Sequence, residues 1–93
     1  NIVIAYEPVW AIGTGLTASV EKVSEIHSFI RTILKDLFSE SESNNVPIIY
    51  GGSVNSGNAD ELINVHAVNG FLIGGASLDV DKFVEIINIV DKI

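Results

Sequence analysis

One carboxylate and three glycine-bearing segments carry the residue types and spacings that could do chemistry. Glu7 directly follows the apolar run 2–6. Paired glycines directly follow two later apolar runs, at 51–52 and 74–75, and the segment 13–15 holds two more glycines. Glycines allow backbone N–H groups to approach an anion closely. If the three runs are parallel strands, these residues lie at one edge of a sheet, where α/β proteins bind their ligands.

Glu7 is a candidate general base. Alternate residues of a strand share a face, so Glu7 points to the same side as Val3 and Ala5, the inner side of a barrel. Pro8 cannot donate to a strand ladder and marks the end of this strand. A carboxylate at the inner end of a barrel strand is placed to take a proton from a substrate. The alternative is a strand-end glutamate held in a salt bridge, and position alone does not separate the two.

The glycine pairs also have two interpretations. Either pair taken singly is typical of a tight turn. Their convergence beside Glu7 favours phosphate binding instead. The segment 75–77 predicts one turn of helix whose free N–H groups attract a phosphate dianion. An acidic protein could bind an anion in this way, through backbone dipoles.

The segment 13–18 also matches G-x-G-x-x-A, the dinucleotide-binding fingerprint. That fingerprint requires the first glycine directly after a strand, whereas residues 7–12 intervene here. The next apolar run, 46–50, does not end in an acidic residue either. We therefore expect no dinucleotide.

Three short strands that alternate with helices must position these residues. Continuous apolar runs at 2–6, 46–50 and 70–73 are typical of parallel strands buried on both faces. Apolar residues at three- and four-residue steps predict helices between and after them. The helices are expected at 20–38, at 58–64 with Asn58 and Glu61 as a capping box, and from about 80 with Asp79 as cap, whereas 41–45 is expected to be a polar turn.

A three-stranded parallel sheet is incomplete as a domain. It has two open edges, and both of its faces require cover. The predicted helices suffice for one face only. We therefore expect the chain to be part of a longer polypeptide; the alternative is that copies of it close on one another.

Composition narrows the partners. Five Lys and Arg against twelve Asp and Glu give 5 − 12 = −7, which argues against nucleic acid or an anionic membrane as a partner. No apolar run reaches the roughly 18 residues of a membrane span. We expect no signal peptide, because the chain opens directly on an apolar, strand-like run without a basic region or cleavage site. The chain has no cysteine, and neither His27 nor His66 has a second ligand at metal spacing, so no metal site is expected. These features favour a soluble cytosolic protein.

Residues Ala5–Gly15 resemble the signature of the triosephosphate isomerase family residue for residue. Segments 50–54 and 70–78 are similar to two later loops of that family, in the same order and at the same separations. The resemblance covers the whole chain. It implies an α/β fold formed by the C-terminal three βα units, strands six to eight, of a (β/α)8 TIM barrel. Residues 1–93 would then be the C-terminal part of a single barrel domain of about 250 residues.

The resemblance also implies a reaction. The family interconverts dihydroxyacetone phosphate and glyceraldehyde 3-phosphate through an enediolate, in glycolysis and gluconeogenesis, with Glu7 in the place of the base. The backbone N–H groups of Gly13, Ser53 and Gly75 would bind the phosphate, and Gly74 would allow its close approach. The family uses no metal or other cofactor. Its enzymes are cytoplasmic homodimers that bind a triose phosphate and neither nucleic acid nor membrane.

Residues 8–18 resemble the hinged lid of that family, which excludes water from the reacting carboxylate. The hydroxyl groups of Tyr50 and Ser53 would help to hold the lid closed. Leu16 departs from the lysine that the family usually carries at the second hinge, which affects hinge flexibility and surface charge but not the base. The family's active-site lysine and histidine belong to earlier strands, so we expect these 93 residues alone to be inactive and to fold poorly.

Two alternatives remain open. One is another phosphate-binding barrel enzyme that uses the same last two loops; such an enzyme does not need the segment 7–10 or the lid. The other is a non-enzymatic half-barrel that binds or assembles with copies of itself.

Overall fold

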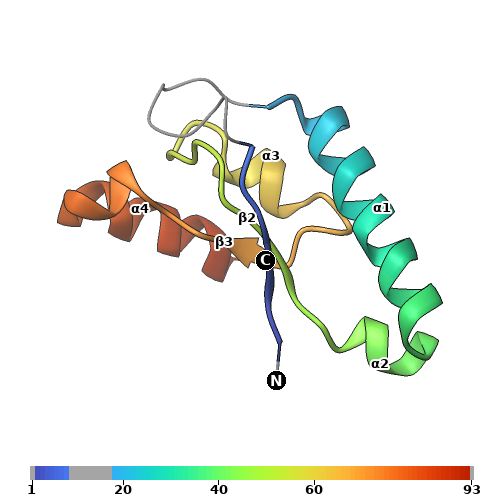
Figure 1. Ribbon diagram of the computed structural model, residues 1–93. Coiled ribbons are helices and arrows are strands. Elements are labelled where there is room, and N and C mark those ends of the chain that lie inside the picture. Colours follow the sequence, from blue (N-terminus) through green and yellow to red (C-terminus); the bar gives the residue numbers. More distant parts are fainter. Residues whose placement is uncertain (1, 9–17, 93) are drawn as a thin grey trace.

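The computed structural model describes residues 2–8 and 18–92, which form three βα units in succession (Figure 1). Within these residues the strands pair in parallel in the order β1-β2-β3. The α/β class predicted from the alternating pattern is confirmed. The elements are β1 (Ile4–Tyr6), α1 (Val20–Leu37), α2 (Glu40–Asn44), β2 (Ile48–Tyr50), α3 (Ala59–Ile63), β3 (Gly70–Phe71), the 3-10 helix η2 (Gly75–Leu78) and α4 (Val80–Asp91).

The strands are shorter than the apolar runs predicted, but the first two end where expected. Tyr6 lies opposite Tyr50, and Tyr50 lies opposite Phe71. Because paired residues of a sheet point to the same face, these three aromatic side chains share one face. Ala5 and Ile49 belong to the other face.

Helix α1 begins and ends close to the predicted residues. The Ser19 hydroxyl accepts a hydrogen bond from the Lys22 backbone N–H at 3.2 Å, which satisfies one free donor of the first turn. Val23 and Leu34 are buried on one side of the helix. The helix ends at Phe38, whose extended backbone turns the chain away.

The predicted polar turn at 41–45 is wrong, because α2 occupies 40–44. The Ser39 hydroxyl accepts from the Glu42 N–H at 3.0 Å and lies 3.2 Å from the Glu42 carboxylate. Ser39 and Glu42 have the S-x-x-E spacing of a capping box, so the sequence did carry a helix signal here.

Helix α3 occurs where predicted, but the predicted capping box is wrong. Asn58 precedes the helix without capping it. Its side chain instead accepts from the Asn55 N–H at 2.8 Å and donates to the Ser53 carbonyl at 3.0 Å. The Asn55 side chain satisfies the N–H groups of Gly57 and Asn58 in its place. Asp79, by contrast, caps α4 as predicted.

The core lies between the helices and one face of the sheet. Each of α1, β2, α3 and α4 contributes residues with almost no exposed surface, namely Val23, Tyr50, Ala59, Leu62 and Ile86. Helix α3 contacts both α1 and α4, so the helices form a continuous layer along this face (Figure 1).

The opposite face of the sheet has no cover within the described residues. Val3 is 59% exposed and Leu72 is 45% exposed, although both are apolar. Ala5 and Glu7 are exposed on the same face as Val3. The prediction that the helices cover only one face is confirmed.

Candidate active site

The described strand ends meet at one edge of the sheet. The Gly51 N–H donates to the Tyr6 carbonyl at 2.8 Å, and the Leu72 N–H donates to the Tyr50 carbonyl at 2.9 Å. These bonds continue the parallel ladder past the assigned strands. They fix the starts of the segments that follow each strand, so Glu7 and the two glycine pairs emerge at the same edge.

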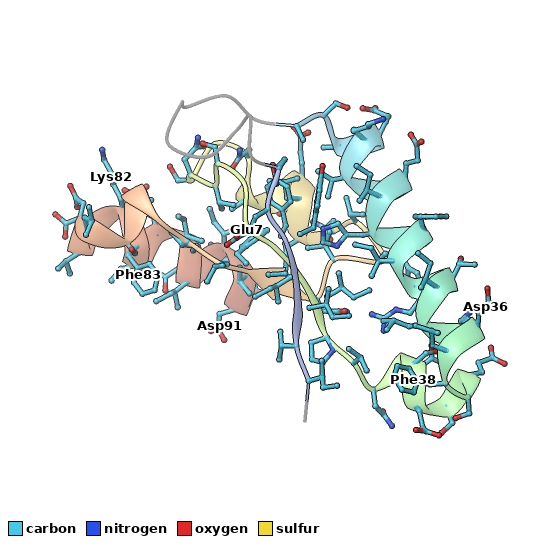
Figure 2. The ribbon with its side chains drawn as sticks, viewed as in Figure 1. Glu7, Asp36, Phe38, Lys82, Phe83 and Asp91 are labelled. Carbon is cyan, nitrogen blue, oxygen red and sulfur yellow. The ribbon has the colours of Figure 1, made fainter. Side chains whose placement is uncertain are left out.

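Glu7 lies on the uncovered face, directly over the chain that leaves β2. A Cβ atom placed on Gly51 would lie 2.8 Å from the Cγ atom of Glu7, which is closer than packed carbon atoms approach. The absence of a side chain at Gly51 therefore leaves the space that the Glu7 side chain occupies. Figure 2 shows Glu7 at the end of β1, on the side away from α1. The position agrees with the predicted strand alternation, while its catalytic use stays a prediction.

Gly52 is required by the tyrosine two residues before it. A Cβ atom at Gly52 would lie 2.0 Å from the Tyr50 hydroxyl oxygen and 2.3 Å from Cζ. The Tyr50 ring is fully buried beneath this turn. Both glycines of the pair thus accommodate a neighbouring side chain, which is a steric reason for them that does not depend on any ligand.

The segment after β2 is held by side-chain amides. The Asn58 amide donates to the Ser53 carbonyl, as described above, and the Asn55 carbonyl accepts from the Ala59 N–H at 3.0 Å. The loop that presents Ser53 is therefore tied to the start of α3.

The segment after β3 turns at once into η2. The predicted single turn of helix at 75–77 is confirmed as a 3-10 turn, Gly75–Leu78. The Ser77 backbone N–H and hydroxyl both donate to the Gly74 carbonyl, at 2.9 and 2.5 Å. Among the described residues, apart from the immediate chain neighbours, no atom lies within 4 Å of a Cβ placed on Gly74 or Gly75. That part of the chain therefore leaves room beside this backbone, which an approaching anion needs.

Three packed rings lie behind the site. The His27 ring lies 5.7 Å from the Tyr6 ring, edge to face, and 6.2 Å from the Tyr50 ring. His27 is fully buried, and its Nδ1 atom donates to the Ala67 carbonyl at 3.3 Å. Burial lowers the pKa of His27, and the positive charge of Arg31 adds to this, although the Ala67 carbonyl partly opposes it. The ring is therefore neutral at physiological pH.

The Tyr50 hydroxyl lies in the same buried region. The His27 Nε2 atom has no hydrogen-bond partner within the part of the chain that the structure describes. Burial raises the pKa of Tyr50, although a hydrogen bond with the Ala18 backbone partly opposes this, so the hydroxyl keeps its proton.

Some predicted residues fall elsewhere. Gly13, Leu16 and most of the predicted lid lie outside the described residues. His66 is exposed. In the described ranges no cluster of three His, Cys, Asp or Glu side chains could hold a metal ion, and no helix there is long and apolar enough to cross a membrane.

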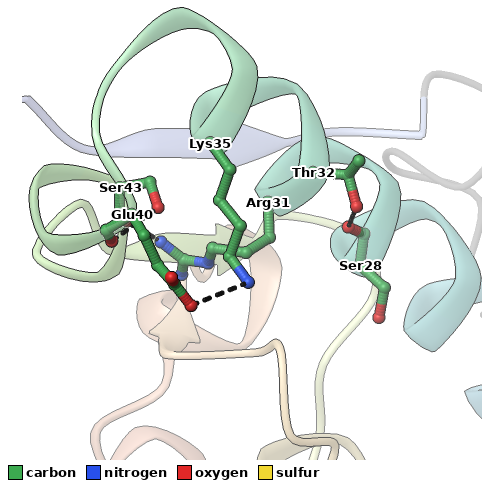
Figure 3. A network of polar contacts seen from close by, with 6 residues as sticks. All are labelled: Ser28, Arg31, Thr32, Lys35, Glu40 and Ser43. Atoms are coloured by element: carbon green, nitrogen blue, oxygen red, sulfur yellow. Dashed lines mark hydrogen bonds and ion pairs between the residues drawn. The ribbon is translucent and has the colours of Figure 1, made fainter.

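Sequence reasoning missed a polar network at the opposite edge of the sheet, and Figure 3 draws two of its residues, Arg31 and Ser43. The Arg31 guanidinium donates to the Ser43 carbonyl, to the Val46 carbonyl at 2.6 Å and to the Asn69 side-chain oxygen at 2.8 Å. The same Asn69 oxygen accepts from the Ile48 N–H at 2.9 Å. The partners lie 12 to 38 positions from Arg31, so no local pattern signals them.

Comparison with known proteins agrees with this geometry. The sequence profile described as triosephosphate isomerase matches residues 1–90. The chain belongs to the triosephosphate isomerase family. It is 58% identical over 87 residues to the triosephosphate isomerase of Chloroherpeton thalassium, an alignment that covers 94% of this chain and 34% of that protein. It is 55% identical over 88 residues to that of Borreliella burgdorferi, covering 95% of this chain and 35% of the relative.

The chain thus spans about a third of the length of the triosephosphate isomerases that it matches. Three parallel strands with helices on one face fit part of a TIM barrel, in which the uncovered face is the inner one. The family resemblance predicted from the three motifs is confirmed.

Proposed function

We propose that residues 1–93 form the last three βα units of a triosephosphate isomerase barrel, and that the whole protein interconverts dihydroxyacetone phosphate and glyceraldehyde 3-phosphate. Glu7 moves a proton between adjacent carbons of the substrate through an enediolate. The observation that carries this proposal is the position of Glu7: it stands at the end of β1, on the uncovered sheet face, at the same edge as both glycine pairs.

The phosphate of the substrate binds to backbone N–H groups of Gly13, Ser53 and Gly75, with Gly74 allowing close approach. Support comes from the room that the described residues leave beside Gly74 and Gly75 and from the fixed loop that presents Ser53. Backbone dipoles suit this task in a chain whose net charge is −7, because they attract an anion without a basic side chain.

The remaining features of the proposal come from the family. The whole enzyme is a cytoplasmic homodimer that needs no cofactor, and residues 8–18 close over the substrate. Tyr50 supports such a lid, because it packs in the same core cluster as Ala18, the last residue of that segment.

The direct test is a Glu7→Gln substitution in the full-length protein. Loss of the base should lower kcat for triose phosphates by about 10³-fold or more, while KM changes little, because the phosphate contacts remain. Glu21→Gln, which neutralises an exposed carboxylate of α1, is the matched control and should leave kcat unchanged.

A Glu7→Gln enzyme that keeps kcat within about tenfold of the wild type would contradict the assignment of the base. Absence of isomerase activity in the wild-type protein, with turnover of a different phosphorylated substrate, would favour another phosphate-binding barrel enzyme instead.

A further inference from the structure

A second polar hollow lies at the amino-terminal edge of the sheet, far along α1 from the candidate active site. This basic groove, of about 550 Å³, lies between the C-terminal half of α1 and the segment 66–69. Its lining includes Arg31, Lys35 and His66. Both walls belong to consecutive βα units of this chain, so the groove does not depend on strands that would complete a barrel.

The charge of the basic groove is opposite to that of the chain. Acidic residues outnumber Lys and Arg by twelve to five, yet none of the described residues that line the groove is Asp or Glu. The neighbouring groove along α1 is lined by Glu21, Glu25 and Glu61 and by no Lys or Arg in the described part of the chain. The linings of the two grooves along α1 therefore carry opposite charge.

The other polar residues of the basic groove are uncharged hydrogen-bonding groups. The Ser28 hydroxyl and the side-chain amides of Asn44 and Asn69 can donate into the groove, whereas the Thr32 hydroxyl donates to the Ser28 carbonyl at 3.1 Å. A volume of several hundred Å³ suits a small molecule rather than a single ion. Hydroxyl and amide donors beside cationic side chains are the groups that bind phosphate oxygens.

One of the two cations is fixed and the other is free to move. Three acceptors hold the Arg31 guanidinium in place, so its charge is oriented before any ligand binds. Within the described residues the Lys35 ammonium has one ion pair, a loose one at 3.9 Å with the Glu40 carboxylate, and the two side chains are 44% and 77% exposed (Figure 3). Such an exposed pair contributes little, so a dianion could replace Glu40 as the partner of Lys35.

We infer that the basic groove is a second anion-binding site, which takes a small phosphate-bearing molecule at the opposite edge of the sheet from Glu7. Lys35 is its main contact, and the fixed charge of Arg31 adds attraction. The site is independent of the proposed isomerase reaction.

Inorganic phosphate is the probe, titrated into the full-length protein while backbone amide signals are followed by NMR. Signals of Thr32, Lys35 and Asn69 should shift saturably. Lys35→Glu should weaken that transition about tenfold or more, since it replaces a charge-assisted contact with repulsion. Lys22→Glu makes the same charge change on the same helix, outside the groove, and should leave it nearly unchanged.

The two anion sites can be read separately in this experiment. Signals of Gly74 and Gly75 report the proposed substrate site and should respond equally in all three proteins. If they fail to respond while the groove signals saturate, the substrate-site proposal fails and the groove inference stands. The inference is overturned if the groove signals do not saturate, or if Lys22→Glu weakens their transition as much as Lys35→Glu.

Discussion

Replacing Gly52 by alanine tests how closely the loop after β2 packs on the core. The new Cβ would lie 2.0 Å from the Tyr50 hydroxyl oxygen and 2.3 Å from Cζ, where packed heavy atoms keep about 3.5 Å or more. The ring cannot retreat, because it is fully buried against the rings of Tyr6 and His27. Either the loop or the core must therefore move by more than 1 Å, by the difference of these distances.

The expected cost follows from that displacement. Overpacking a core costs about 1–3 kcal/mol, and a conflict with a ring that cannot move belongs in the upper half of that range. A loss of about 2 kcal/mol lowers Tm by about 4–8 °C in a domain of barrel size. The loop also presents Ser53, so isomerase kcat/KM should fall by about 100-fold, as for a misplacement of about 1 Å.

Thermal and urea unfolding of the full-length protein measure the stability change. Gly75→Ala is the matched stability control, because its Cβ would meet no atom of the described residues within 4 Å apart from its chain neighbours. The double variant Tyr50→Phe with Gly52→Ala removes the nearest clashing atom and should recover part of the loss. The packing argument is refuted if Gly52→Ala unfolds within about 0.5 kcal/mol of the wild type, the range of an ordinary surface change.

Two further predictions concern stability. Arg31→Met removes the three hydrogen bonds to Ser43, Val46 and Asn69 and should lower the free energy of urea unfolding by about 2–4 kcal/mol. The control Lys22→Met, on an exposed part of α1, should lower it by less than about 0.5 kcal/mol. Equal losses of stability in the two variants would contradict a stabilising role of the network. Burial lowers the pKa of His27 in the folded state below 6.5, so the unfolded chain binds more protons than the folded one below that pH. The free energy of unfolding should therefore fall as the pH drops from about 6.5 to the folded-state pKa, by up to about 1.4 kcal/mol per pH unit. The free energy of unfolding, measured between about pH 8 and 5, should no longer show this slope in the His27→Gln variant. If the slope persists in that variant, groups other than His27 cause it.

Local patterns predicted most of the architecture. The apolar runs located the strands, and the spacing of apolar residues located α1 and α4 within a residue or two. The end of β1 at Tyr6 followed from Pro8, which cannot join a ladder. These features depend on residues close together in sequence, which is why one sequence sufficed.

The errors came where hydrogen-bond partners compete. Ser39 and Glu42 cap α2, although the polar composition of 41–45 indicated a turn. Asn58 had the correct spacing to Glu61 but bonds to Asn55 and Ser53 instead, because those groups lie closer in the folded loop. Such choices depend on geometry that forms only when the loop folds.

The candidate site likewise has features that local sequence patterns predicted and features that they could not predict. The position of Glu7 on its strand followed from alternation, and the motifs indicated the family. The steric roles of Gly51 and Gly52 could not be predicted, because they depend on where the side chains of Glu7 and Tyr50 pack. The network around Arg31 joins residues that are distant in sequence and gave no local signal.

Asn69 helps to set the register between β2 and β3. Its backbone N–H donates to the Ile48 carbonyl at 2.8 Å, while its side-chain oxygen accepts from the Ile48 N–H. Asn69 therefore forms hydrogen bonds with both the backbone N–H and the carbonyl of Ile48 on the neighbouring strand. Parallel strands have no tight hairpin to set their offset, and a slip by one position would exchange the two faces of β3. Asn69 therefore fixes the register of β3 against β2, which the hydrophobic pattern of a strand only two residues long could not specify.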